Sequence, residues 1–261
     1  MVRRRVALIA VLTVLSTGRG LSLEQATAQA PTLLFDHTHT YGEVVAYLQG
    51  VAKAFPQITR VHTIGKSFLG KDLLVLEVTN HNTGAALEKP GYWIDGNLHA
   101  GEVFGGEACL STIHTIVTGY GKDPTITRIV DNYTFYIMPK LNPDGSDHYI
   151  TKPDGMRSVV RPYDDDGDGR LDEDPPEDLD GDGYITMMRV ADPNGPMRTS
   201  PEDPRLMVPR TQGVDKEKWV GQWRVYQEGI DNDNDGTFNE DVVGGIDINR
   251  NFPEHWLPSP I

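Results

Sequence analysis

Two short motifs combine residue types that can hold a metal ion and a carboxylate. His99 and Glu102 stand three residues apart, and zinc accepts both an imidazole nitrogen and a carboxylate oxygen as ligands. Near the end of the chain Asn249 and Arg250 are neighbours, and a planar guanidinium suits a bidentate hold on a carboxylate. The motifs indicate a metal site and an anion site. Taken alone, the first motif has a plainer interpretation: the histidine ends a strand, and the glutamate complements the dipole of the helix that follows.

Three acidic segments repeat another pattern, in which aspartates alternate with other residues before a glycine. We name them the first loop (residues 164–169), the second loop (178–183) and the third loop (231–236). Their alternating aspartates are Asp164, Asp166 and Asp168, then Asp178, Asp180 and Asp182, then Asp231, Asp233 and Asp235. This spacing collects oxygen ligands for Ca²⁺, and the glycine allows a sharp turn.

The loops differ from full EF-hands at the twelfth position, where a glutamate is expected. Pro175, Arg189 and Val242 stand there instead. The pattern therefore predicts shortened calcium loops of the extracellular kind, and it leaves the number of ions open. An acidic segment that is merely solvated or disordered is the alternative.

Apolar periodicity indicates the elements that position these motifs. Helical spacing predicts helices at residues 41–55 and 102–117, and strand patterns occur at 60–64, 73–79, 92–98 and 133–139, the third of them buried. Asn142-Pro143-Asp144-Gly145, directly after the last strand, is typical of a turn. Helices interleaved with strands predict an α/β fold with a mixed, largely parallel sheet flanked by helices. His99 and Glu102 then lie where a strand gives way to a helix, which is where α/β sheets bind ligands.

Composition narrows the classes of partner. The chain has 261 residues, 38% of them hydrophobic, which suffices for a buried core, and its net charge of -14 argues against nucleic-acid binding. Cys109 is the single cysteine, so no internal disulfide is possible, and its apolar helical surroundings favour a core position over a reactive thiol.

The N-terminus has the features of an export signal. Arg3, Arg4 and Arg5 precede an apolar run at residues 6–15, and Ala26-Thr27-Ala28 offers a cleavage site. We expect a signal peptide over residues 1–30, a secreted or periplasmic protein, and no stable membrane span after the signal is removed. A membrane-tethered N-terminus or a misplaced start is the alternative.

The motifs together resemble those of the carboxypeptidase A-like zinc peptidases. The order is His-x-x-Glu, then Asn-Pro-Asp-Gly, then Asp-x-Asn-Arg-Asn-Phe at residues 247–252, and residues 64–72 are similar to that family's early strand pair. The resemblance covers residues 41–253 apart from an acidic insertion at about 163–241. It implies that His99 and Glu102 are zinc ligands and that Asn249 and Arg250 grip the C-terminal carboxylate of a peptide. It also implies that Arg157, or Arg161 failing that, polarises the scissile carbonyl.

The resemblance implies a zinc metallocarboxypeptidase that removes C-terminal residues from peptides or proteins by metal-activated water. In the family the third zinc ligand and the general-base glutamate lie well beyond the Asn-Arg pair, and His255 is too close to that pair to be the ligand. We therefore expect residues 31–261 to be the N-terminal part of a zinc carboxypeptidase-like domain whose C-terminal part is missing. Two other functions stay open: a non-catalytic, calcium-binding peptidase-like module, and a zinc amidohydrolase acting on acyl-amino acids or cell-wall peptides.

Overall fold

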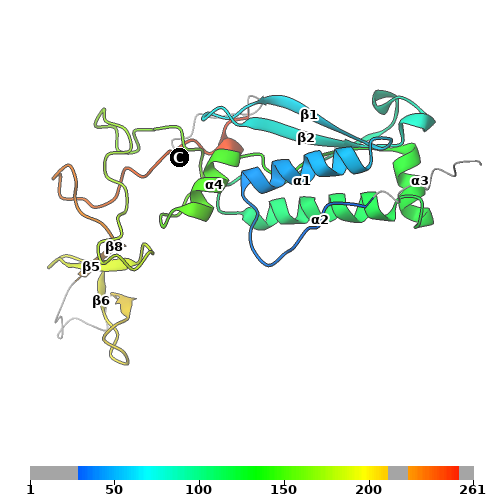
Figure 1. Cartoon of the computed structure of the whole chain (residues 1–261). Helices are drawn as coiled ribbons and strands as arrows, with labels where there is room; N and C mark the ends of the chain where they lie inside the picture. Colours follow the sequence, from blue (N-terminus) through cyan, green and yellow to red (C-terminus); the bar gives the residue numbers. More distant parts are fainter. Residues whose placement is uncertain (1–28, 211–222, 253–261) are drawn as a thin grey trace, which may run out of the picture.

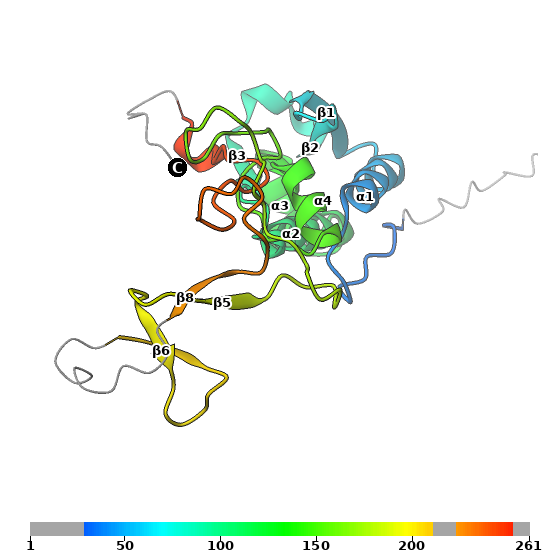
Figure 2. The same ribbon diagram turned by 90° about the vertical axis from the view of Figure 1, so that its left-hand side faces the viewer.

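The computed structural model describes residues 29–210 and 223–252, and it places them in a helix-and-sheet body and a projecting insertion. In Figure 1 the helices α1 and α2 run below the strand pair β1–β2, while β5, β6 and β8 stand away from the body. Figure 2, turned by 90°, shows the same separation. The signal peptide expected at residues 1–30 lies outside the described residues except for its last two, and His255 lies outside them too.

The body contains a four-stranded sheet in the order β1-β2-β4-β3. Its strands are β1 (Thr59–Lys66), β2 (Asp72–Val78), β3 (Gly91–Asp95) and β4 (Thr134–Met138). The mixed α/β fold is thus confirmed. The expectation of a largely parallel sheet is wrong for the described strands, because β1–β2 and β2–β4 are antiparallel and only β3–β4 is parallel. The short turn at residues 67–71 allows only antiparallel neighbours, whereas the helical crossover between β3 and β4 permits a parallel pair.

In the part of the chain that the structure describes, four α-helices accompany this sheet: α1 (Tyr41–Ala54), α2 (Val103–Gly119), α3 (Pro124–Asn132) and α4 (Pro143–Thr151). A capping box of Thr40 and Glu43 starts α1, and both predicted helices are confirmed to within two residues. The helices bury an apolar face against the sheet, and Leu48, Leu76, Leu110 and Ile137 are fully buried in this core. Cys109 lies among them, and burial raises the pKa of its thiol to about 11.

Two local predictions are corrected. Residues 142–145 do not form a free turn but begin α4, with Asn142 as the N-cap and Pro143 in the first turn, where its missing N–H costs nothing. The third strand is not buried, since Tyr92 is 53% exposed and Trp93 is 52% exposed. Its aromatic residues suggested burial, but β3 is an edge strand of the described sheet.

The insertion has a second sheet of antiparallel pairs in the order β5-β8-β6-β7. Its strands are β5 (Met187–Ala191), β6 (Met197–Thr199), β7 (Met207–Pro209) and β8 (Trp223–Gln227). An isolated bridge joins Asp174 to Asp241, at the two ends of the insertion. After it, the 3₁₀ turn η3 (Ile248–Arg250) returns to the body; two more, η1 (His81–Thr83) and η2 (Ala86–Glu88), lie between β2 and β3. Among the described residues, no helix has the length and apolar character required to traverse a bilayer.

Candidate functional site

The loop between β3 and α2 carries His99 and Glu102, and close backbone packing fixes its shape. A Cβ at Gly96 would lie 2.3 Å from the carbonyl oxygen of Gly105, so only glycine fits there. Asn97 adopts a left-handed φ of 59°, and its side-chain amide donates to the carbonyl oxygens of His99 (2.9 Å) and Ala100 (3.0 Å). The loop is therefore rigid at the point where it presents the imidazole.

His99 is the centre of the site and is only 7% exposed. Its Nδ1 lies 2.8 Å from Oε1 of Glu102, yet among the described residues this buried nitrogen has no hydrogen-bond partner. An orphaned buried nitrogen beside a carboxylate oxygen is the arrangement that two ligands of one zinc ion require. On the other side of the ring, Nε2 lies 3.3 Å from Oδ1 of Asp247.

Asp247 was not singled out from the sequence, although it opens the Asp-x-Asn-Arg motif. Burial raises its pKa, but the backbone N–H of Asn249 and the guanidinium of Arg157 hold that pKa below its usual range. An ionised carboxylate at the far nitrogen of a metal-binding histidine fixes the tautomer and the orientation of the ring.

Arg157 lies in the same cluster. Its Nε donates to Oδ2 of Asp247 at 3.0 Å and its Nη2 donates to Nε2 of His99 at 2.8 Å, while Nη1 is 3.8 Å from Oε1 of Glu102. The backbone N–H of Ala100 donates to the carbonyl oxygen of Arg157 at 2.9 Å. Arg161 is exposed and lies four residues further along the chain.

The start of α4 holds the Arg157 segment in place. The side-chain amide of Asn142 donates to the carbonyl oxygen of Ser158 at 2.9 Å. The backbone N–H of Asn142 donates to the carbonyl oxygen of Asn97 at 3.1 Å. Asn142 thus ties the segment after α4 to the loop that bears His99.

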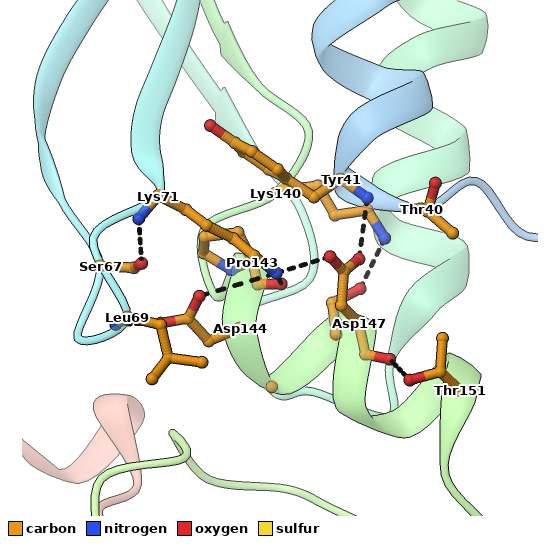
Figure 3. Close-up of polar contacts among 12 residues, drawn as sticks. Thr40, Tyr41, Ser67, Leu69, Lys71, Lys140, Pro143, Asp144, Asp147 and Thr151 are labelled. Atoms are coloured by element: carbon orange, nitrogen blue, oxygen red, sulfur yellow. Dashed lines mark hydrogen bonds and ion pairs between the residues drawn. The ribbon is translucent and has the colours of Figure 1, made fainter.

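Polar contacts anchor α4 itself to the rest of the body (Figure 3). The carboxylate of Asp144 accepts from the backbone N–H of Leu69 at 2.9 Å, and Lys71 pairs with Asp147 at 2.5 Å. Asp147 also accepts from the backbone N–H of Tyr41 at 2.8 Å. The Asn-Pro-Asp-Gly motif therefore acts as scaffold for the site.

Asn249 and Arg250 lie in η3, next to Asp247 in the chain. The N–H of Asn249 donates to Oδ1 of Asp247 at 2.8 Å, and Nη1 of Arg250 donates to the carbonyl oxygen of Asn249 at 3.1 Å. Both residues are exposed. The structure brings His99, Glu102 and Arg157 together, and it leaves Arg250 exposed, three residues after Asp247 in the chain.

The acidic loops share one backbone arrangement. In each, the carboxylate of the first aspartate accepts from the N–H of the last glycine: Asp164 from Gly169 at 3.0 Å, Asp178 from Gly183 at 2.8 Å and Asp231 from Gly236 at 3.0 Å. The three glycines have φ values of 97°, 90° and 96°, which other residues rarely adopt. In the first and third loops, oxygens of the three alternating aspartates lie within 4.8 Å of one another, whereas in the second loop Asp178 and Asp180 cluster with Glu228 and Asp182 is not part of that cluster.

Five clusters of three carboxylates have oxygens within 4.8 Å of one another in the described part of the chain. They are Asp164, Asp166 and Asp168; Asp166, Asp235 and Glu240; Asp168, Glu173 and Asp233; Asp178, Asp180 and Glu228; and Asp231, Asp233 and Asp235.

Three glutamates in these clusters were missed in the sequence. Glu173 and Glu240 each follow an acidic loop at its tenth position, which a search limited to position twelve overlooks. Glu228 is remote from the second loop in sequence and carried no signal. The neighbouring carboxyl of Asp241 raises the pKa of Glu173 to about 7, and burial, followed by the carboxyl of Asp174, raises that of Glu240 to about 7.

Comparison with known proteins agrees with the body of this structure. The family profile described as zinc carboxypeptidase matches residues 44–179. Carboxypeptidase M of Mus musculus is 38% identical over 120 residues, which are 46% of this chain and 27% of that protein. Carboxypeptidase D of Homo sapiens is 33% identical over 109 residues, 42% of this chain and 8% of that protein. The match thus spans less than a third of either relative.

Solved carboxypeptidase structures give partial superpositions. Carboxypeptidase A from Helicoverpa armigera is 31% identical with a TM-score of 0.44, covering 52% of this chain and 32% of that one. Thrombin activatable fibrinolysis inhibitor is 26% identical with a TM-score of 0.46 over the same shares. Because the family profile takes in just over half of the residues, including His99, Glu102 and Arg157, this chain belongs to the zinc carboxypeptidase family.

Proposed function

We propose that this protein is a zinc-dependent metallocarboxypeptidase that releases C-terminal residues from peptides. The observation that carries the proposal is the buried Nδ1 of His99, which has no hydrogen-bond partner among the described residues and lies 2.8 Å from the carboxylate of Glu102. Family membership supports zinc as the ion that this pair binds.

His99 and Glu102 are the residues that would hold zinc. Once Arg157 has turned away from Nε2 of His99, Asp247 would accept a proton on that nitrogen, which keeps the Nδ1 lone pair free for the metal. When bound, zinc acts as a Lewis acid on the scissile carbonyl and lowers the pKa of the attacking water. Catalytic zinc sites typically have three protein ligands, and no cluster of three candidate ligands in the described ranges includes His99 or Glu102, so activity requires a further ligand.

Arg157 is the residue we assign to the carbonyl oxygen of the substrate. Its side chain is 54% exposed, so it can leave Nε2 of His99 and turn toward a substrate. A guanidinium in that position stabilises the negative charge that develops on the oxygen in the transition state. Arg161 is the less favoured alternative because Arg157 already contacts His99 and Asp247.

Asn249 and Arg250 are the residues we assign to the substrate's terminal carboxylate. A guanidinium binds a carboxylate through two parallel hydrogen bonds, and the exposed Arg250 is accessible for that contact. A clamp for a chain end restricts cleavage to the last residue, and it also positions the peptide bond for attack.

We also propose that the acidic loops bind a second cofactor, Ca²⁺. The proposed ligands are Asp164, Asp166 and Asp168 in the first loop, Asp178, Asp180 and Asp182 in the second, and Asp231, Asp233 and Asp235 in the third. The support is that each loop contributes to a cluster of carboxylate oxygens and contains the turn glycine that calcium loops need. The N-terminal pattern supports a secreted or periplasmic location, where calcium is available.

Zinc content and peptide hydrolysis test the main proposal. We expect the full chain to retain zinc on dialysis and His99→Ala to lose it, as measured by atomic emission. We expect hydrolysis of a blocked peptide with a free C-terminus and none of the same peptide with a C-terminal amide. A zinc-free wild type, or equal cleavage of acid and amide, would overturn the proposal.

Arg250→Ala tests the clamp. We expect it to raise KM and lower kcat, because the lost contact both binds and positions the substrate. Arg128→Ala, which removes an exposed arginine of α3, is the matched control and should leave both constants unchanged. Equal kinetics for the two variants would remove Arg250 from the proposed site.

A further inference from the structure

The first and third acidic loops are the starts of two copies of one longer pattern. In residues 164–174 and 231–241, aspartate stands at positions one, three and five, glycine at six, glutamate at ten and aspartate at eleven. We call these two segments the paired loops. Together they hold twelve carboxylates and one basic residue, Arg170. They lie at opposite ends of the insertion.

The structure pairs the two copies reciprocally. The second residue of each donates its backbone N–H to the last aspartate of the other: Asp165 to Asp241 at 2.7 Å, and Asn232 to Asp174 at 3.0 Å. The two terminal aspartates also form the antiparallel bridge between the segments. The contacts have the pattern of an approximate two-fold axis between the paired loops.

The candidate ligand oxygens follow the same symmetry. Asp166, at position three of one copy, clusters with Asp235 and Glu240, at positions five and ten of the other. Asp233, at position three of the second copy, clusters with Asp168 and Glu173, at positions five and ten of the first. Each copy thus completes an oxygen cluster of its partner.

Buried oxygens at these clusters lack donors. Among the described residues, both carboxylate oxygens of Glu240, Oε2 of Glu173 and Oδ2 of Asp241 are buried without a hydrogen-bond partner. Asp241 is 0% exposed, and its carboxyl faces that of Glu173. A buried, unpaired carboxylate is costly, and two that face each other are stabilised either by a shared proton or by a cation between them.

The second loop provides an internal contrast. Its partner Glu228 is also buried, but Oε1 accepts from the N–H groups of Leu179 (2.8 Å) and Asp180 (3.2 Å). Oε2 accepts from the N–H and hydroxyl of Thr186. Protein donors therefore satisfy Glu228, whereas the glutamates of the paired loops have none for the oxygens just named.

We propose that the paired loops form one clasp for two Ca²⁺ ions, in which Glu173 and Glu240 are ligands and each loop lends a carboxylate to the other's ion. This rests on the calcium binding proposed above and adds its ligands and its geometry. An all-oxygen, carboxylate-rich set without His or Cys suits a hard cation, and bridging carboxylates suit the six to eight ligands of Ca²⁺ better than the strict octahedron of Mg²⁺.

The clasp would also set the geometry of the zinc site. Beyond the paired loops the two ends of the insertion run together, with the N–H of Val159 donating to the carbonyl oxygen of Ile246 at 3.1 Å. They end at Arg157 and Asp247, whose side chains meet at 3.0 Å although 90 residues separate them. Calcium therefore stabilises the closure that places both residues beside His99, and offsets its entropy cost.

Calcium titration of the full, chelator-treated chain tests the stoichiometry. By isothermal calorimetry we expect E173Q/E240Q to bind two ions fewer than the wild type, whatever the second loop binds. Glu202→Gln, an exposed glutamate of the same insertion, is the matched control and should bind as the wild type does. Wild-type stoichiometry in E173Q/E240Q overturns the clasp and leaves calcium binding by the loops standing. A wild type that binds no calcium overturns both, while zinc content and hydrolysis decide the peptidase proposal separately.

Thermal unfolding in chelator shows whether E173Q/E240Q has lost its ion sites or has failed to fold. Without calcium we expect E173Q/E240Q to be at least as stable as the wild type, because the substitution removes unpaired carboxylates that repel each other. Unfolding of the variant in chelator, where the wild type stays folded, would contradict the proposal. Hydrogen exchange at residues 157–163 and 242–247 should slow on adding calcium to the wild type and not to the variant; equal slowing would overturn the link to the zinc site.

Discussion

The body of the protein and its acidic insertion are stabilised by opposite kinds of interior. In the body, aliphatic side chains such as Leu48, Leu76 and Leu110 are fully buried between helices and sheet. In the described residues of the insertion no hydrophobic side chain is buried to that degree, and the buried ones are Asp174, Glu228, Asn239 and Asp241. The family's catalytic framework thus folds by apolar burial, while the segment that joins Arg157 to Asp247 depends on how its carboxylates are neutralised.

Removal of calcium should have the largest effect, and it should fall on the insertion alone. At a free calcium concentration a hundredfold above Kd, each ion contributes about 2.7 kcal/mol, so two ions would contribute roughly 5 kcal/mol. We expect chelator to lower the unfolding transition of the insertion and to leave that of the body in place, as followed by hydrogen exchange across both regions. A uniform loss of protection would show that the two regions do not differ in this way.

Leu110→Ala should have the next largest effect on stability, and this loss should fall on the body and not on the insertion. Leu110 is 0% exposed in the core beneath the sheet, and a buried Leu→Ala substitution costs about 3 kcal/mol through lost burial and the cavity that remains. Urea unfolding should give the same loss in calcium and in chelator. Leu206→Ala, an exposed leucine of the insertion, is the control and should cost little. A calcium-dependent loss for Leu110→Ala would argue that the core and the clasp are one unit.

Asp247→Asn tests the residue through which the end of the insertion contacts His99, one of the two proposed zinc ligands. A neutral amide is a weaker partner for the proton on Nε2 of His99, and loss of such a partner typically weakens metal binding by roughly 10- to 100-fold. Competition with a chromogenic zinc chelator measures this. Asp203→Asn, which removes a carboxylate paired with Arg205 in the insertion, should leave zinc affinity unchanged. Equal affinities in the two variants would detach Asp247 from the metal site.

The sequence predicted best where local pattern decides structure. The periodic apolar residues of α1 and α2 and the turn glycines of the acidic loops carry their own geometry, and the structure has them as expected. The pairing of His99 with Glu102 also lies within one loop. These features follow from residues a few positions apart.

Features that depend on distant partners could not be predicted from the pattern. Asp247 meets Arg157 across 90 residues, and Glu228 meets the second loop from the far end of β8. The exposure of Trp93 depends on which strand lies at the edge of the sheet. The prediction of a turn at residues 142–145 was wrong for another reason. The same residue types favour both a turn and the start of a helix, and only the helix that follows distinguishes the two.

The smallest effect we predict is that the stability of the body and the stability of the insertion change in opposite directions with pH. In the body, hydrogen bonds from the backbone and side chain of Thr40 lower the pKa of Glu43 to about 2, below its ordinary value of 4.5. This capping interaction is complete above pH 4.5 and is lost as the pH falls toward 2, so acid weakens the body. In the ion-free insertion, the pKa values of Glu173 and Glu240 are raised to about 7. Their repulsion is relieved by protonation, so in chelator the insertion should become more stable as the pH falls from 8 to 5.

Calcium should reverse that trend in the insertion, because protons then compete with the ions for the same carboxylates. Hydrogen exchange at pH 5 and pH 8, with calcium and with chelator, measures both signs in one protein. E173Q/E240Q should abolish the pH dependence of the insertion in chelator, and Glu202→Gln should preserve it. If the wild-type insertion in chelator lost protection on acidification, as the body does, its buried carboxylates would already be paired by the protein. The contrast between an apolar body and an ion-dependent insertion would then fail at its most specific point.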